Sequence, residues 1–484
     1  MNTINKIIFA VIIISAFSFS AKAFAATMVV NDPTGALASN AQCSITEAIL
    51  NANANNQSGS VDCPAGSGID TILLNTDITF TTPYMNGFND TSATPFITES
   101  LVINGQNHTL DRNSTSNFRF FHVTTAPVTL SFKNMIMENG SSGAGGFMYM
   151  VAMNGLAIDN VQFIGGVSGW EGGAIYANGI ANGVTIQKSK FENNSGGMGG
   201  ALFINEADTK IQATQFLNND ASAFYGGAIT VAYSSLGIVD STLDGNTGGA
   251  IHTFGGTGAT AIVPVRIEHS TLSNNETDSG ASVIRSESSM HLTMINTTVS
   301  GNENLSGPTI ALYTGDDLSK IVIAYSTFYG NASSTNEGVI KSMYSPIEVS
   351  VENSIFAANA GGDCNLDTFV IDTLTNNRSS DATCGTTPAT GVDPVLANNG
   401  GTTKTHKLLT GSNAIDTAIN TPGLHVMCPK QDQRHSARMQ DGNGDGIVAC
   451  DIGAYEYNKR ALAQATTATV KSAFEEPTKK SDIK

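Results

Sequence analysis

Residues 441–446 have the composition and spacing of a calcium-binding loop. Their sequence, DGNGDG, places side-chain oxygens at the first, third and fifth positions and glycine at the sixth, as in loops that wrap Ca²⁺. The twelfth position holds isoleucine instead of glutamate, and an aspartate lies one residue earlier. We predict either a calcium site formed by Asp441, Asn443, Asp445 and Asp451 or a plain turn rich in glycine and aspartate. Calcium is the only cofactor that the sequence suggests.

A second group of charged residues lies near the same end of the chain: Asp416, Asp432, Arg434, Asp451 and Glu456. The last four of these residues could form a catalytic site, or all five could form a buried salt-bridge network that locks a C-terminal cap. The network explains the same residues with fewer assumptions. Separately, the eight histidines lack the spacing of zinc ligands, and chain order alone supports no Ser–His–Asp triad. We therefore assign the group to the cap structure and assign no catalytic residue.

The cysteines fall into three close pairs at the two ends of the chain: Cys43 and Cys63, Cys364 and Cys384, and Cys428 and Cys450. Six cysteines allow about fifteen pairings, and we favour the pairing of neighbours. Disulfides are typical of exported proteins. The long middle of the chain contains no cysteine and needs another source of stability.

Residues 1–25 have the features of a secretory signal peptide. Lys6 precedes an apolar run from Ile7 to Phe19, and small residues follow up to Ala25. The apolar run is shorter than the roughly 20 residues of a membrane span, so a membrane anchor is the weaker alternative. We expect a bacterial protein that is extracellular, on the outer surface or periplasmic, with no transmembrane segment after the signal is removed.

The composition indicates many short strands. Charged residues make up 13% of the 484 residues, 49 residues are glycine, and the net charge is −17. A helical bundle needs charged outer faces, and a disordered chain is poor in the Ile, Val and Phe that recur here. The acidic balance argues against a nucleic-acid partner.

A repeat of about 27 residues fills the middle of the chain. Its anchors are apolar residues followed three positions later by Asn or Gly: Met137, Phe163, Phe191, Phe216, Leu243, Leu272, Val299, Phe328 and Phe356. Five residues before each anchor stands a second apolar residue: Phe132, Ile158, Ile186, Ile211, Ile238, Ile267, Met294, Ile323 and Val351. Gly-Gly-Ala and related segments lead to a third apolar set: Ile175, Leu202, Ile229, Ile251, Val283, Ile310 and Ile340.

The repeat predicts an all-β fold, a single-stranded right-handed parallel β-helix. Each period is long enough for three short strands and three turns, and like residues then stack about 4.8 Å apart. Asn suits left-handed corners and can form amide ladders between turns, while Gly-Gly permits positive φ and close backbone approach. Leucine-rich and helical repeats are disfavoured because the middle lacks helix-forming stretches. The length that first suggests several domains becomes one solenoid.

The ends of a solenoid expose unpaired strand edges and must be covered. Ser44 and Glu47 form a capping-box pattern at the start of a short amphipathic helix. We predict an N-terminal cap with this helix at 26–68, the β-helix at 69–363, C-terminal coils and a disulfide-tied cap at 364–457, and a flexible polar tail at 458–484.

Both ends resemble bacterial secreted β-helix proteins that have a CSLREA-type N-terminal motif and a choice-of-anchor Q C-terminal domain. The tail carries matching steps at Asn399–Gly401, Ala414–Asp416, Asp432–Arg434 and Asp451–Glu456, whereas the N-terminal CSITEA departs from the usual motif at two positions. The repeats resemble the passengers of polymorphic outer-membrane proteins, which carry GGAI and FxxN. The second resemblance implies a surface adhesin.

We therefore expect a monomeric exported β-helix that binds a glycan or protein ligand and is not an enzyme. Trp170 and Tyr176 could stack on a sugar ring or pack on neighbouring turns. The alternatives are a polysaccharide lyase or glycoside hydrolase, since fold alone does not decide function, and a structural envelope protein. Lysines and arginines of the repeats share no evident turn with paired acids, which disfavours the enzyme.

Overall fold

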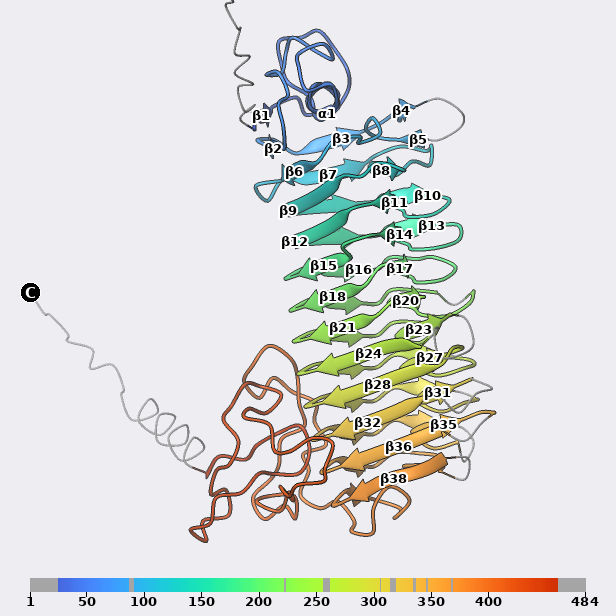
Figure 1. The fold of residues 1–484 in the computed structure, drawn as a ribbon, viewed down its shortest axis with the longest axis vertical. Helices are drawn as coiled ribbons and strands as arrows, with labels where there is room; N and C mark the ends of the chain where they lie inside the picture. The colour runs from blue at the N-terminus through green and yellow to red at the C-terminus, as the bar shows by residue number, and fades with distance from the viewer. Residues whose placement is uncertain are drawn as a thin grey trace, which may run out of the picture.

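The computed structural model describes residues 25–459 except 87–90, 222, 256–261, 305, 314–318, 334–336, 345–346 and 367–368. The predicted signal peptide and polar tail lie almost entirely outside these residues. The described chain forms a parallel β-helix, drawn in Figure 1 as a vertical rod. None of its helices is long and apolar enough to cross a membrane.

Three strand faces run along the rod. The first face contains β1 (Thr27–Val30), β2 (Asp70–Leu74), β6 (Leu101–Asn104), β9 (Thr129–Glu138), β12 (Gly155–Ile164), β15 (Val184–Gln187), β18 (Thr209–Gln212), β21 (Leu236–Val239), β24 (Val263–Glu268), β28 (Met290–Ile295), β32 (Lys320–Ala324), β36 (Ile347–Glu352) and β38 (Phe369–Thr375). The second face contains β3 (Ile78–Phe80), β7 (Thr109–Arg112), β16 (Lys190–Glu192), β19 (Gln215–Leu217), β22 (Thr242–Asp244), β25 (Thr271–Ser273), β29 (Thr298–Ser300), β33 (Thr327–Tyr329), β37 (Ile355–Ala357) and β39 (Arg378–Ser379), and β9 and β12 continue into it.

The third face contains β8 (Phe121–Thr124), β11 (Met148–Met153), β14 (Ile175–Ile180), β17 (Leu202–Asn205), β20 (Ile229–Ala232), β23 (Ile251–Phe254), β27 (Ile284–Ser286), β31 (Ile310–Leu312) and β35 (Ile340–Ser342). Short parallel strands lie between the second and third faces: β10 (Ser141–Ser142), β13 (Val167–Ser168), β26 (Glu276–Thr277), β30 (Glu303–Asn304) and β34 (Ala332–Ser333). We call this corner the loop edge. Near the N-terminal end, β4 (Tyr84–Met85) and β5 (Thr91–Ser92) pair antiparallel.

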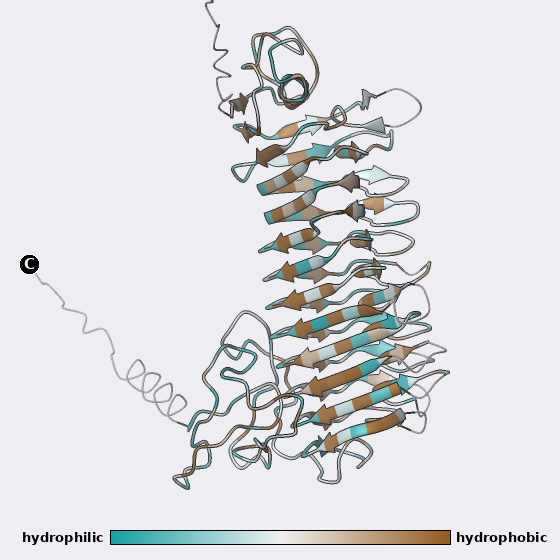
Figure 2. Cartoon of the chain, in the orientation of Figure 1, coloured by the Kyte–Doolittle hydropathy of each residue, from teal (hydrophilic) through white to brown (hydrophobic). Residues whose placement is uncertain are grey.

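The predicted apolar columns form the core of the rod. Each anchor residue pairs with the next one along the chain, so that Phe191 lies between Phe163 and Phe216 with ring centroids 4.7 and 4.8 Å away. The second column is also in the predicted register. Figure 2 shows hydrophobic residues concentrated in the strands. The third column is wrong at one position, because Ile284 and not Val283 pairs with Ile251.

The two roles predicted for the corner asparagines belong to adjacent residues. Asn274 has the left-handed backbone, with φ of 52°. Asn275 is buried, and its amide donates to Asn302 Oδ1 at 2.9 Å and accepts from Asn246 Nδ2 at 2.8 Å. Such bonds link a continuous ladder of buried or half-buried amides: Asn194, Asn219, Asn246, Asn275, Asn302, Asn331 and Asn359.

The two glycines of each Gly-Gly pair are required for different reasons. Gly199 has φ of 65°, a conformation that L side chains rarely adopt. At Gly200 a side chain has no room, because a Cβ atom would lie 2.2 Å from the carbonyl oxygen of Gly227 in the next turn. The first glycine thus serves the corner conformation and the second serves close packing of turns.

A short helix covers the N-terminal end of the rod (Figure 1). Helix α1 (Ile45–Ala54) starts at Ser44, whose hydroxyl accepts from Glu47 N, while the Glu47 carboxylate accepts from Ser44 N. This is a complete capping box. The helix packs on β1 and β2, and a disulfide joins Cys43 to Cys63 beside it.

The Cys43–Cys63 disulfide is expected to stabilise this cap. Replacing both cysteines with serine should lower the free energy of unfolding by roughly 2–5 kcal/mol, because the unfolded chain gains freedom and two buried sites become polar. Thermal unfolding of the variant against the parent chain measures the effect. An unchanged melting temperature contradicts a stabilising role for this staple.

The C-terminal segment lies along the side of the rod and not over its last turn (Figure 1). Residues 388–457, here called the flank segment, contact the second face over several turns. Gln433 Nε2 donates to Thr271 Oγ1 at 2.9 Å, and Thr298 Oγ1 donates to Gln433 Oε1 at 2.6 Å. Farther along, Ala454 N donates to Thr327 Oγ1 at 3.0 Å. The predicted cap is therefore a side domain, held by contacts between residues far apart in sequence.

Outward residues of the second face change where the flank segment docks. Before the docked region this column carries half-buried or exposed side chains: Gln162, Lys190, Gln215 and Thr242. Under the flank segment it carries buried ones: Thr271, Thr298, Thr327 and Ile355. Three of the four covered positions are threonines, whose short side chains let the flank segment approach the sheet closely and satisfy its polar groups.

Candidate functional site

The loop edge gathers carboxylates into one column along the rod. Asp220, Thr247 and Glu276 occupy successive positions joined by parallel bridges, and Glu303 pairs with Glu276 in the next turn. The parallel stacking that builds the core therefore also places residues spaced by one repeat side by side on the surface. Like charges at such positions repel each other, so an acidic pair here adds nothing to the stability of the edge.

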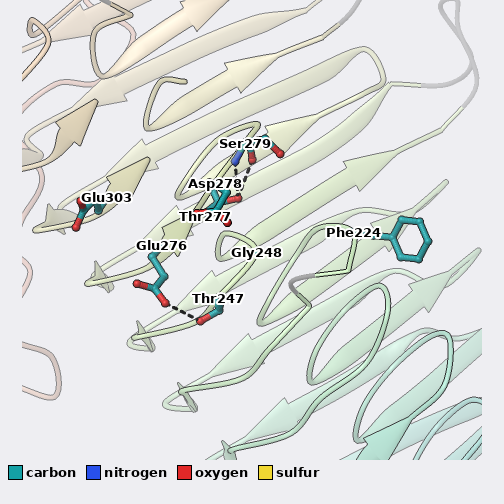
Figure 3. A pocket seen from close by; sticks show the side chains of 8 residues that line it. All are labelled: Phe224, Thr247, Gly248, Glu276, Thr277, Asp278, Ser279 and Glu303. Atoms are coloured by element: carbon teal, nitrogen blue, oxygen red, sulfur yellow. Dashed lines mark hydrogen bonds between the residues drawn. The ribbon is translucent and has the colours of Figure 1, made fainter. Parts of the chain in front are cut away.

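A pocket of about 310 Å³ opens beside this column (Figure 3). Thr247 Oγ1 donates to Glu276 Oε1 of the adjacent turn at 3.1 Å, and Thr277 Oγ1 donates to the carbonyl of Ser279 at 2.7 Å. The pocket is lined by Phe224, Thr247, Gly248, Glu276, Thr277, Asp278, Ser279 and Glu303. Because no lysine or arginine is among these eight residues, the lining suits a neutral or cationic group and disfavours an anionic one.

Exposed aromatic side chains lie on the same edge. Trp170 is 66% exposed, and Phe224 is 50% exposed. Gly197 separates their turns, and a Cβ atom there would lie 3.4 Å from Phe224 Cδ2 and 2.7 Å from the carbonyl oxygen of Trp170. The glycine thus leaves space for the Phe224 ring beside the Trp170 backbone. Large aromatic surface beside polar groups is typical of binding sites.

Tyr176 packs on side chains of neighbouring turns, which was one of the two arrangements expected for it. Its ring stacks between Tyr149 and Phe203 on the third face, with centroids 4.8 and 5.4 Å away. Burial raises the pKa of the Tyr176 hydroxyl. This tyrosine belongs to an aromatic column on the third face, whereas Trp170 remains available to a ligand.

An arginine held between two tyrosine rings lies on the third face next to the pocket loop. The Arg285 guanidinium is sandwiched between the rings of Tyr225 and Tyr313 at 4.0 and 3.9 Å, and its Nε and Nη2 donate to Glu287 Oε1 at 2.8 and 2.6 Å. The neighbouring His252 ring and Arg285 hold the pKa of Glu287 at about 2. The charge of Arg285 is thus used within the protein, which suits a positioning role better than proton transfer.

Arg285 also revises one expectation from the sequence. It lies in the same turn as Glu276 and Asp278, although the repeats showed no evident pairing of basic residues with acids. The 27-residue spacing of Glu276 and Glu303 was the signal that could have revealed the pocket, because stacking of equivalent positions makes them neighbours.

The five residues of the predicted network meet inside the flank segment. Arg434 Nη2 donates to Asp432 Oδ2 at 2.6 Å, and Glu456 N donates to the same oxygen at 2.9 Å. Asp451 N donates to Glu456 Oε2, and Asp416 N donates to Asp451 Oδ1. Burial beside Glu456 raises the pKa of Asp451 to about 8, and burial also raises the pKa of Glu456. Asp432, Asp451 and Glu456 are buried, and Asp416 and Arg434 are half-buried, so the hydrogen bonds of the group lie within the flank segment.

Sequence reasoning left one member of the network out. Arg438 is buried, and its Nη1 donates to Glu456 Oε2 at 3.2 Å. Its Nη2 donates to Asn296 Oδ1 of the rod at 2.7 Å. The arginine therefore joins the network to the rod, a role that only the three-dimensional contact reveals.

Of the four predicted calcium ligands, Asp441, Asn443 and Asp445 lie in one hydrogen-bonded loop, and Asp451 lies outside it. Both carboxylate oxygens of Asp441 accept backbone N–H groups of its own loop, as do Asn443 and Asp445 through one oxygen each. Asp451 is buried in the network instead, and Asp416 contacts the loop by accepting from Asn443 N.

Calcium binding by this loop stays a prediction from the sequence. Millimolar Ca²⁺ is expected to raise the melting temperature of the chain, because ligand binding to the folded state stabilises it. Asp445→Asn removes one charged ligand and should abolish the shift, while Asp62→Asn on the distant N-terminal cap should not. A melting temperature that ignores Ca²⁺ identifies the plain turn.

All three disulfides join the neighbours favoured from the sequence: Cys43 to Cys63, Cys364 to Cys384, and Cys428 to Cys450. The first lies beside α1, the second lies at the last turns of the rod, and the third lies within the flank segment.

These features define a parallel β-helix protein with a docked side domain and an aromatic, acidic loop edge. A family model described as "Putative pectate lyase-like adhesive domain" matches residues 65–166, which span β2 to β12. The loop-edge pocket lies beyond this match. No curated protein and no solved structure matches the chain.

Proposed function

We propose that the chain is an exported β-helix protein that acts by binding a surface ligand, as an adhesin does. The match to an adhesive-domain family supports this role, as do three disulfides typical of exported proteins. The resemblance of the chain ends to secreted choice-of-anchor proteins, and of the repeats to outer-membrane passengers, supports placement at the cell envelope.

The loop edge is the binding surface that the geometry favours, and its exposed aromatics carry the proposal. Trp170 and Phe224 offer apolar faces, while Glu276, Asp278 and Glu303 offer acceptors for hydroxyl or amino groups. A neutral or amino-sugar glycan supplies both kinds of partner. Polyuronates carry carboxylates that this pocket repels.

A glycan array probed with residues 26–484 tests the proposal. Binding of a neutral or amino-sugar glycan is expected, and Trp170→Ala and Phe224→Ala should each weaken it at least about tenfold, since aromatic anchors dominate such interfaces. Tyr233→Ala is the matched control, because Tyr233 is 56% exposed but lies outside the loop edge. Binding that survives both loop-edge variants contradicts this site.

An enzyme on the same scaffold is the second candidate. The observation in its favour is the shared turn of Arg285, Glu276 and Asp278. A turnover assay on the array glycans, with Arg285→Lys as the variant, separates the two. Cleavage of a glycan by the parent chain and its loss in the variant favours the enzyme over the adhesin.

A further inference from the structure

We propose that Glu348, Asp372 and His425 form a zinc site that fastens the flank segment to the last turns of the rod. Glu348 lies on β36 and Asp372 on β38, while His425 belongs to the flank segment. One ligand atom from each lies within 4.8 Å of the others. These residues come from three separate parts of the chain, so no motif in the sequence predicts that they meet.

The distances suit ligands of one ion. His425 Nε2 lies 3.1 Å from Asp372 Oδ2. A tetrahedral zinc ion with bonds of about 2.0–2.2 Å holds its ligand atoms roughly 3.3–3.6 Å apart. Small shifts of exposed side chains reach this geometry, since the three are between 36 and 42% exposed. Water can complete the coordination from the open side.

A buried carboxylate fixes the orientation of the histidine. His425 Nδ1 lies 3.1 Å from Glu352 Oε1, and Glu352 also accepts from the backbone N–H groups of His425 and Val426 at 3.0 and 3.1 Å. A carboxylate held this way accepts a hydrogen bond from Nδ1–H, and Nε2 then faces Asp372. The arrangement matches the carboxylate–histidine pairs that support metal ions in proteins.

The chemistry of the ligands favours zinc over calcium. An ion bound between His425 and Asp372 meets one imidazole nitrogen and one carboxylate oxygen, which lie 3.1 Å apart. Calcium and magnesium prefer oxygen ligands only, whereas zinc accepts imidazole together with carboxylates. Two carboxylates and one neutral imidazole also balance the charge of a divalent ion.

A second histidine cluster on the flank lacks this arrangement. Asp240, His269 and His435 also come together, but Asn296 Nδ2 lies 3.0 Å from His269 Nε2. The amide cannot turn over, because its Oδ1 accepts from Arg438 and its Nδ2 donates to the carbonyl of Gln431. The Asn296 amide therefore donates to His269 Nε2, and the ring proton of His269 is on Nδ1, where it blocks metal binding. This cluster is suited to hydrogen bonding and serves as the control.

Isothermal titration of the metal-free chain, residues 26–484, with ZnCl₂ tests the proposal. One equivalent should bind, more tightly than Mn²⁺, and raise the melting temperature by roughly 2 °C or more at a hundredfold excess over Kd. His425→Gln and Asp372→Asn should each weaken zinc binding at least about a hundredfold. His435→Gln should bind zinc as the parent does. The melting temperatures of all three variants should respond to Ca²⁺ as that of the parent does.

Lys320 provides an independent test of the location. Its Nζ lies 2.6 Å from Glu348 Oε2 and competes with a metal ion for this carboxylate. Lys320→Gln is therefore expected to tighten zinc binding. If His425→Gln does not fold, the visible spectrum of Co²⁺ bound to the parent and to Asp372→Asn replaces it. The proposal is wrong if the parent binds no zinc, if both ligand variants bind it normally, or if His435→Gln abolishes binding.

Discussion

Arg438→Met is expected to detach the flank segment and to lower its free energy of unfolding by roughly 3–5 kcal/mol. Arg438 and Glu456 side chains are 0 and 1% exposed, so the variant leaves a buried carboxylate without its partner. It also removes the hydrogen bonds to Asn296 Oδ1 and the carbonyl of Gly453, both at 2.7 Å. Guanidinium unfolding, with limited proteolysis of the flank segment, measures the loss.

Arg266→Met is the matched control for this variant. Arg266 also pairs with a glutamate, Glu268, but its side chain is 55% exposed. Surface pairs of this kind contribute at most about 1 kcal/mol. Equal effects of the two substitutions, or a protease-resistant flank segment in Arg438→Met, contradict the assigned role of Arg438.

Asn275→Ala is expected to lower the free energy of unfolding of the rod by roughly 3–4 kcal/mol. The buried Asn275 amide donates to the carbonyl of Leu243 and to Asn302, and it accepts from the backbone and side chain of Asn246. Alanine leaves several of these buried groups without partners, at about 1–3 kcal/mol for each. Thermal and guanidinium unfolding measure the change.

A variant of the neighbouring Asn274 distinguishes the contribution of the amide ladder from that of the corner conformation. Asn274 has positive φ and an exposed side chain, so Asn274→Gly keeps the conformation and loses one exposed hydrogen bond to Asp244. This variant should stay within about 1 kcal/mol of the parent. A small effect of Asn275→Ala, or a large effect of Asn274→Gly, refutes the division of roles between the two residues.

The solenoid could be predicted because its contacts repeat. Phe163, Phe191 and Phe216 recur at one period, and stacking of equivalent residues follows directly from that period. The single error in register, Val283 for Ile284, occurs where the loop edge changes length. Likewise, the split between Asn274 and Asn275 depends on backbone angles that residue type alone does not determine.

The flank segment and the sites that it builds were harder to predict, because their contacts do not repeat. Gln433 bonds Thr271 across 162 residues. No periodicity connects His425 with Asp372 and Glu348, and spacing along the chain suggested that the histidines were scattered. The change from Gln215 to Thr271 in the outward column was the available signal, but it indicates coverage without identifying the covering segment.

The flank segment also determines how the length of this rod can evolve. Between Asp240 and Asn376 it contacts particular turns, through His435 at one end and Thr417 at the other. Gain or loss of a turn within this stretch puts every later contact out of step. The turns before Asp240 have no such partner among the described residues, so duplication there can lengthen the molecule without disturbing the docked contacts.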